Sequence, residues 1–240
     1  MARAKADSSL IYMVITPKHN PMCGRFAFAT KRRKLENQFS VPNLLASPPP
    51  NYNVAPTQQV AIIRENPGAG RLISNAIWGL VPFWAKDRKM AHRTINARAE
   101  TVREKPSFRH CFRRKRCIIP ASGFYEWHTL GELRQPHYIS RKDGHILAFA
   151  GLWDLWEQKG ELVESCSILT TTANDFMKPI HERMPVILKK KDYEGWLDCS
   201  NENPSSLLQQ YPSKKMQSWP VSSLVGNPRN NLPELIEPVA

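Results

Sequence analysis

The sequence has no apolar run long enough to cross a membrane. Its apolar stretches are short, as at 146–153, and small residues interrupt them, whereas a membrane-spanning helix needs about 20 apolar residues. The apolar patch at 10–15 is too short and too broken for a secretory signal. We therefore expect a cytoplasmic protein with no membrane association.

Cysteine is scarce and scattered. The five cysteines, at positions 23, 111, 117, 166 and 199, form an odd set without a Cys-x-x-Cys pair. A disulfide framework usually needs an even number, and zinc sites typically use closely spaced pairs. The spacing therefore indicates free thiols and predicts no metal site.

Acidic residues are few beside the basic ones. The chain has 34 Lys and Arg against 21 Asp and Glu, which gives a formal net charge of +13. This excess favours association with a polyanion through phosphate contacts and counterion release, so nucleic acid is the favoured partner. The alternative is a protein that is merely soluble and basic.

The 240 residues, 41% of them hydrophobic, suffice for one domain with a sizeable core. No internal repeat is present, and the order of elements does not follow regular βαβ units. We predict an α+β fold: a single β-rich domain of curved, partly barrel-like sheets with short peripheral helices. Residues 1–22, which lack a sustained period, are expected to be an extension that is disordered or absent from the mature protein, and 229–240 a C-terminal tail.

The expected strands lie at 59–64, 72–80, 117–127, 137–140, 145–153 and 165–171. The segment 117–127 is a strand pair or a bent strand broken at Pro120 and Gly123, and 137–140 and 145–153 form a hairpin. The expected helices lie at 31–39 after a Thr30 cap, 107–114, 174–177, 191–197 and 205–210.

Cys23 follows a possible initiator, Met22. Removal of Met22 would be favoured because Cys is small, and Cys23 would then carry a free α-amine beside its thiol. An amine forms an imine with an aldehyde, and the adjacent thiol can close onto the imine carbon as a thiazolidine. Taken alone, a cysteine near a chain start more often serves packing.

Glu126 and His181 are candidate proton-transfer groups. Glu126 lies within the aromatic segment PASGFYEW, where burial would raise its pKa and suit it to shuttle protons. His181 lies two residues before Arg183, a possible phosphate-binding residue. The alternatives are a surface position for Glu126 and a structural role for His181.

Other segments contain amide, aromatic and basic side chains suited to a nucleic-acid cleft. Asn53, in NYNVAPT, suits either a rigid cleft lining or a capped turn. The segments WGLVPFW and INARAET follow, and their side chains could stack bases and clamp phosphates, although most tryptophans are core residues.

Each motif is weak alone, but the ordered set resembles the SRAP family (SOS-response-associated peptidase), the abasic-site sensors, from Cys23 to about Val225. The set is MCGR, NYNVAPT, WGLVPFW, INARAET, PASGFYEW, AGLWD, TTAN and HERMPVIL. The sequence departs from the family in the 21-residue segment ahead of Met22. This segment matters because a cysteine inside a chain has its nitrogen in an amide and carries no free amine.

The resemblance implies an SRAP domain at 23–228 that captures abasic sites in single-stranded DNA as a covalent thiazolidine crosslink through Cys23, shielding the lesion. Asn96 would orient the Cys23 end or the sugar, Glu126 would move protons, and His181 would open the sugar and act in reversal. Candidate DNA contacts are Arg25, Asn53, Trp78, Trp84, Arg98, Trp127 and Arg183.

By the same resemblance the protein is a lyase-type crosslinking enzyme that removes the residues before Cys23 by autoproteolysis. We expect a monomer without cofactors that associates with the nucleoid when bound to DNA. Two other classes fit the residues: an N-terminal-nucleophile cysteine amidohydrolase, and a non-catalytic basic protein that binds intact and abasic single strands alike.

Overall fold

The computed structural model describes residues 24–42, 49–66 and 68–239. Cys23 and the expected extension at 1–22 lie outside these residues. The strands are β1 (Phe26–Phe28), β2 (Asn51–Val54), β3 (Gln59–Asn66), β4 (Gly70–Trp78), β5 (Asn96–Arg98), β6 (Arg116–Ala121), β7 (Gly123–Leu130), β8 (Leu133–Arg141), β9 (Leu147–Gln158), β10 (Glu161–Thr172), β11 (Arg183–Pro185) and β12 (Met216–Pro220).

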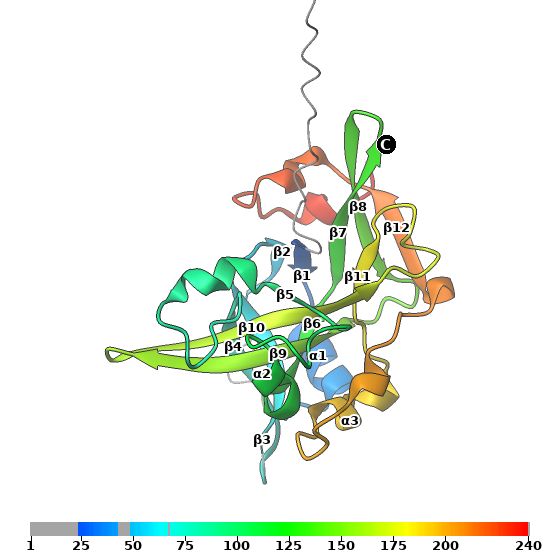
Figure 1. The fold of residues 1–240 in the computed structure, drawn as a ribbon. Helices are drawn as coiled ribbons and strands as arrows, with labels where there is room; N and C mark the ends of the chain where they lie inside the picture. The colour runs from blue at the N-terminus through cyan, green and yellow to red at the C-terminus, as the bar shows by residue number, and fades with distance from the viewer. Residues whose placement is uncertain (1–23, 43–48, 67, 240) are drawn as a thin grey trace, which may run out of the picture.

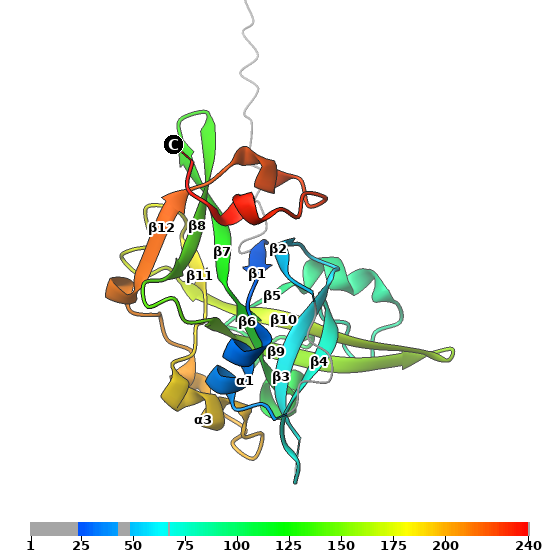
Figure 2. The ribbon, with the colours of Figure 1, turned by 180° about the vertical axis from the view of Figure 1, so that it is seen from behind.

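The helices are short and lie at the periphery (Figures 1 and 2). The α-helices are α1 (Arg32–Phe39), α2 (Arg109–Arg114) and α3 (Tyr193–Leu197). Single 3-10 turns occupy Arg88–Arg93, Lys190–Asp192, Ser205–Leu207, Ser213–Lys215, Ser223–Gly226 and Pro233–Ile236. No helix in the described ranges has the length and apolarity of a membrane span.

The described strands form two sheets. One has the order β12-β8-β7-β1-β2, and the other has the order β11-β10-β4-β3-β6-β9. In the second sheet β9 also pairs with β10, so the strands β10, β4, β3, β6 and β9 form a closed ring. The short strand β5 joins this sheet by pairing with β10. This arrangement confirms the predicted α+β fold with partly barrel-like sheets.

Aromatic side chains join the two sheets. The ring of Phe26, in β1, lies 5.1 Å from that of Trp78 and 6.0 Å from that of Phe149, and Phe124 lies 6.0 Å from Phe149. All four side chains are buried, so they combine apolar burial with favourable ring geometry. These four rings pack β1 and β7 of the five-stranded sheet against β4 and β9 of the other sheet.

Several strand predictions are confirmed, but the hairpin of 137–140 with 145–153 is wrong. β8 pairs with β7 and β12, whereas β9 pairs with β6 and β10, so the turn between them carries the chain from one sheet to the other. The segment 117–127 likewise divides at Ser122 into β6 and β7, which belong to different sheets.

Three helix predictions also change, and in the segment expected at 205–210 only the 3-10 turn Ser205–Leu207 is present. The helix α1 buries Leu35 and Phe39 as expected, but its N-cap is Lys31, without a side-chain cap, rather than Thr30. The segment 174–177 is a turn in which the Asn174 side chain accepts a hydrogen bond from the Met177 amide at 2.9 Å.

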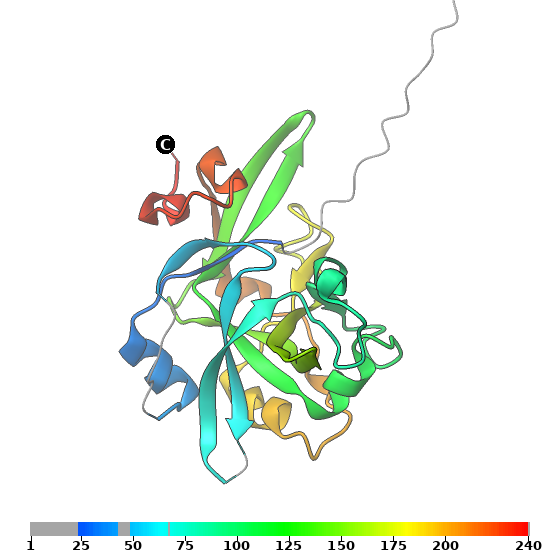
Figure 3. The same cartoon turned by 90° about the vertical axis from the view of Figure 1, so that its left-hand side faces the viewer.

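The segment 229–239, expected to be a tail, packs on the outer face of the five-stranded sheet (Figures 1 and 3). Leu235 is 1% exposed and clusters with Tyr125 and Tyr138. The Trp219 indole donates to the Ile236 carbonyl at 2.9 Å. This segment therefore packs on the sheet, where it covers aromatic rings that would otherwise meet water.

Candidate functional site

Glu126 lies beside the first described residues. β1 and β7 are antiparallel with Phe26 opposite Phe124, and the Tyr125 amide donates to the Arg25 carbonyl at 3.0 Å. The same register places Glu126 opposite Gly24, the residue after Cys23. Glu126 is only 5% exposed. A buried glutamate therefore lies beside the residue that follows Cys23 in the sequence, and Cys23 itself is outside the described residues.

Asn96 begins β5, which pairs in parallel with β10. The indole NH of Trp78 donates to the carbonyl oxygen of Ile95 at 2.9 Å, and the Trp78 ring contacts Phe26. Trp78 thus links β1, the strand at the start of the described residues, to the segment that leads into β5.

The interpretation of Trp78 as a base-stacking residue is wrong. Its side chain is 0% exposed and its only polar atom is hydrogen-bonded within the core. The other two candidates differ: Trp84 is 47% exposed, whereas Trp127 is half-buried against the cluster of Tyr125 and Tyr138. Of the three, Trp84 offers the most ring surface to a ligand.

His181 lies in the loop before β11, half-buried. Its Nδ1 accepts a hydrogen bond from the Arg183 backbone amide at 3.1 Å. In the neutral ring the proton is then on Nε2, so the hydrogen bond selects one tautomer and orients the ring. This geometry suits a side chain that gives or takes a proton at Nε2.

Arg183 joins the His181 loop to the end of β5. Its guanidinium donates to both carboxylate oxygens of Glu100, one of them at 2.9 Å, and to the Thr170 carbonyl at 2.9 Å. Arg183 is buried, so a phosphate would have to displace Glu100 to reach it. The predicted phosphate contact of Arg183 therefore stays a prediction that requires exchange of Glu100, a partner in the INARAET motif that the sequence analysis did not single out.

The Arg183–Glu100 pair makes stability depend on pH. The hydrogen bond from Arg183 lowers the pKa of Glu100 below its usual value. Because the folded-state pKa is depressed, the stabilisation is present above the unfolded pKa of about 4.3 and is lost as pH falls through the folded pKa. We expect Glu100→Gln to lower Tm at neutral pH, with the difference from wild type narrowing in acid. Melting curves from pH 7 to pH 3 test this, and a difference that does not change with pH would contradict it.

Asn53 and Arg25 hold the C-terminal segment. Asn53 is 0% exposed, and its Oδ1 accepts from Arg25 at 2.8 Å. Its Nδ2 donates to the carbonyl oxygens of Val225, Asn227 and Asn230. The prediction that Asn53 lines a DNA cleft is therefore wrong, because its amide is satisfied inside the protein.

The Arg25 side chain is also used in hydrogen bonds within the protein. It donates to the Val225 carbonyl at 2.7 Å as well as to Asn53, and burial lowers its pKa. Arg98, by contrast, is exposed at the end of β5. Arg98 and Trp84 are thus the predicted DNA contacts whose side chains face solvent most openly. In the ranges that the structure covers, no three His, Cys, Asp or Glu side chains are grouped as metal ligands would be.

Comparison with known proteins agrees with this geometry. The sequence profile of the family described as "SOS response associated peptidase (SRAP)" matches residues 22–228. The chain is 44% identical over 223 residues to abasic site processing protein YoqW from Bacillus subtilis, covering 90% of this chain and 99% of that one. It is 31% identical over 217 residues to abasic site processing protein HMCES from Xenopus tropicalis, covering 77% of this chain and 65% of that one.

Solved structures show the same fold. A crystal structure of a protein from Bacteroides thetaiotaomicron matches with a TM-score of 0.80 and 30% identity, covering 91% of this chain and 100% of that chain. Another, from Bordetella bronchiseptica, has a TM-score of 0.73 and 27% identity over 83% of this chain and 100% of that one. The chain belongs to the SOS response associated peptidase (SRAP) family.

Proposed function

We propose that this protein recognises abasic sites in single-stranded DNA and captures them covalently through Cys23. The names of its relatives support abasic DNA as the substrate. The observation that carries the chemistry is the buried side chain of Glu126 in β7, the strand that pairs with β1 in a register that extends toward Gly24. The net charge of +13 supports a polyanionic ligand.

The proposed reaction begins when the sugar ring of the abasic site opens to an aldehyde, with His181 moving the proton of the ring hemiacetal. The α-amine of Cys23 adds to the aldehyde carbon, and Glu126 transfers one proton from the nitrogen to the former carbonyl oxygen, which becomes a hydroxyl group. Glu126 then accepts the second proton of the nitrogen. Glu126 returns a proton to the hydroxyl group, which leaves as water and yields the imine. The thiol then adds to the imine carbon, and its proton moves to the nitrogen of the thiazolidine.

The reaction requires a free amine on Cys23. We propose that this amine arises either from translation that starts at Met22, followed by removal of Met22, or from self-cleavage between Met22 and Cys23 by Glu126 and His181. Intact-mass analysis and N-terminal sequencing of the natively expressed protein distinguish these routes. A crosslinking form that retains residues 1–22 would rule out the thiazolidine and require attack by the thiol alone.

The decisive experiment for the function is a denaturing gel of the natively expressed protein with abasic and intact oligonucleotides. We expect a slow band that resists denaturant with the abasic strand only. A basic single-strand binder would give no such band with either strand. An amidohydrolase would also give none, and would instead cleave an amide substrate.

Noncovalent binding is expected to weaken with salt through phosphate contacts at Arg98. Each contact with a single strand contributes a slope of about −0.7 to log K against log salt. Arg98→Glu should lower the affinity and reduce the slope by about that amount. Fluorescence anisotropy over a salt series measures both quantities, with Lys142→Glu, a change of equal charge at an exposed position in the turn after β8, as the control. A wild-type affinity independent of salt would contradict the contact.

A further inference from the structure

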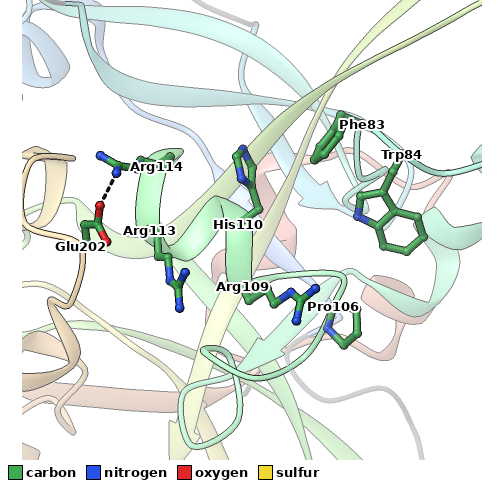
Figure 4. A pocket seen from close by; sticks show the side chains of 8 residues that line it. All are labelled: Phe83, Trp84, Pro106, Arg109, His110, Arg113, Arg114 and Glu202. Atoms are coloured by element: carbon green, nitrogen blue, oxygen red, sulfur yellow. Dashed lines mark hydrogen bonds and ion pairs between the residues drawn. The ribbon is translucent and has the colours of Figure 1, made fainter.

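A concave surface lies between the loop after β4 and helix α2 (Figure 4). We call it the α2 groove. Its volume is about 700 Å³, and it is lined by Phe83, Trp84, Pro106, Arg109, His110, Arg113, Arg114 and Glu202. Figure 4 shows the aromatic rings on one wall and the arginine side chains of α2 on the other. The proposed reaction at Cys23 uses none of these residues.

The two side chains of the aromatic wall are more exposed than large aromatic side chains usually are. Phe83 is 51% exposed and Trp84 47%, and the Phe83 ring contacts the His110 ring at 5.3 Å between centroids. Large aromatic side chains left in water beside a groove commonly mark a binding surface. Their faces can stack on nucleic-acid bases irrespective of sequence.

The basic wall has two arginines available for a ligand. Arg109 and Arg113 are four residues apart on α2, so they share one face of the helix. Arg114 is paired with Glu202 (Figure 4), whereas neither Arg109 nor Arg113 has an ion-pair partner within the described part of the chain. Both are exposed and free to bind anions.

One buried carboxylate holds the two walls in place. Asp154, at the end of the AGLWD motif, is 0% exposed. Its carboxylate accepts hydrogen bonds from the Phe83 amide at 2.9 Å, from the Cys111 thiol of α2 at 3.5 Å, and from Lys115 at 2.7 Å. Burial raises the pKa of Cys111, with Asp154 adding to the effect, so the thiol keeps its proton and donates. The groove is therefore built before a ligand arrives, which reduces the ordering cost of binding.

Both walls of the α2 groove are connected in sequence to β5, the strand that begins at Asn96. The loop that carries Phe83 and Trp84 leads into β5, and the segment after β5 leads through Pro106 into α2. Arg98, exposed at the end of β5, therefore lies on the connection between the two walls. Single-stranded DNA bound at Arg98 would therefore have aromatic side chains available on the chain segment before β5 and arginines on the segment after it.

We propose that the α2 groove binds the part of the single strand that extends beyond the lesion. Arg109 and Arg113 hold consecutive phosphates, Trp84 and Phe83 stack a base, and Asp154 positions both walls. This inference rests on the proposed function and extends the DNA contact past the abasic nucleotide. An acidic peptide would satisfy the arginines but would leave the two rings without a stacking partner.

The test compares intact single strands of about 5 and about 20 nucleotides, a range that brackets the site sizes of single-strand binding folds. For the long strand we expect Arg109→Glu/Arg113→Glu to weaken binding at least about tenfold and to reduce the salt slope by about 1.4, the value for two lost phosphates. Trp84→Leu should weaken binding of the long strand without changing the slope. The matched control is Lys142→Glu/Lys214→Glu, two exposed positions in or near the five-stranded sheet.

Two outcomes would overturn the inference: the same loss in the control pair as in the α2 pair, or the same loss for short and long strands. Displacement of the long strand by poly-glutamate as effectively as by unlabelled DNA would also overturn it. Crosslinking of the short abasic strand is measured separately in each variant. If the wild type fails to crosslink, the proposed function falls while the length-dependent binding still decides the groove; if crosslinking is normal and length has no effect, only the groove inference falls.

Discussion

Cys23→Ser is expected to abolish the adduct that survives hot denaturant, while noncovalent affinity for single-stranded DNA stays within about twofold because no phosphate contact is removed. The variant keeps its α-amine and can still form the imine. A hydroxyl group closes onto an imine carbon far less readily than a thiol, so the imine hydrolyses when the complex is denatured. Denaturing gels over a time course measure the loss.

Borohydride sharpens this experiment because it reduces an imine to a stable secondary amine. The Cys23→Ser variant should become crosslinked when borohydride is present during the reaction, and only then. Cys199→Ser is the matched control, since Cys199 is a half-buried cysteine remote in sequence from the proposed site, and it should behave as wild type. A Cys23→Ser adduct as durable as that of the wild type, without reductant, would contradict the thiazolidine mechanism.

Glu126→Gln is expected to slow crosslinking by about 10² to 10⁴, the usual contribution of a positioned general acid or base. The amide has nearly the shape of the carboxyl group and preserves packing beside Gly24, but it cannot accept the proton of the amine or return it to the leaving hydroxyl. Single-turnover crosslinking rates with an abasic oligonucleotide measure the effect.

The control for this variant is Glu104→Gln, an identical change at an exposed turn position, which should leave the rate unchanged. Circular dichroism and Tm establish that the Glu126 variant is folded. His181→Ala should also slow formation of the crosslink or its reversal. Wild-type kinetics in both Glu126→Gln and His181→Ala would mean that the active site lies elsewhere.

The sequence by itself was sufficient to predict the α+β fold class, the strands around 59–64 and 165–171, the burial of Leu35 and Phe39, and the family. These features are local: alternation of apolar residues, helical spacing and ordered motifs are all read within short windows. For Glu126 the sequence left a buried and a surface position open, and the structure shows the buried one.

The tertiary structure alone decided which polar and aromatic side chains face a ligand. Trp78 and Trp84 stand in one motif, yet the first is a core residue that binds the Ile95 carbonyl and the second is half-exposed on the α2 groove. Asn53 is buried because its amide bonds carbonyl groups more than 170 residues away. The pairing of strands could not be predicted from the sequence either, because β8 and β9 are separated by one turn yet belong to different sheets. Burial and pairing depend on contacts between distant segments, and no local pattern records which distant segment will supply them.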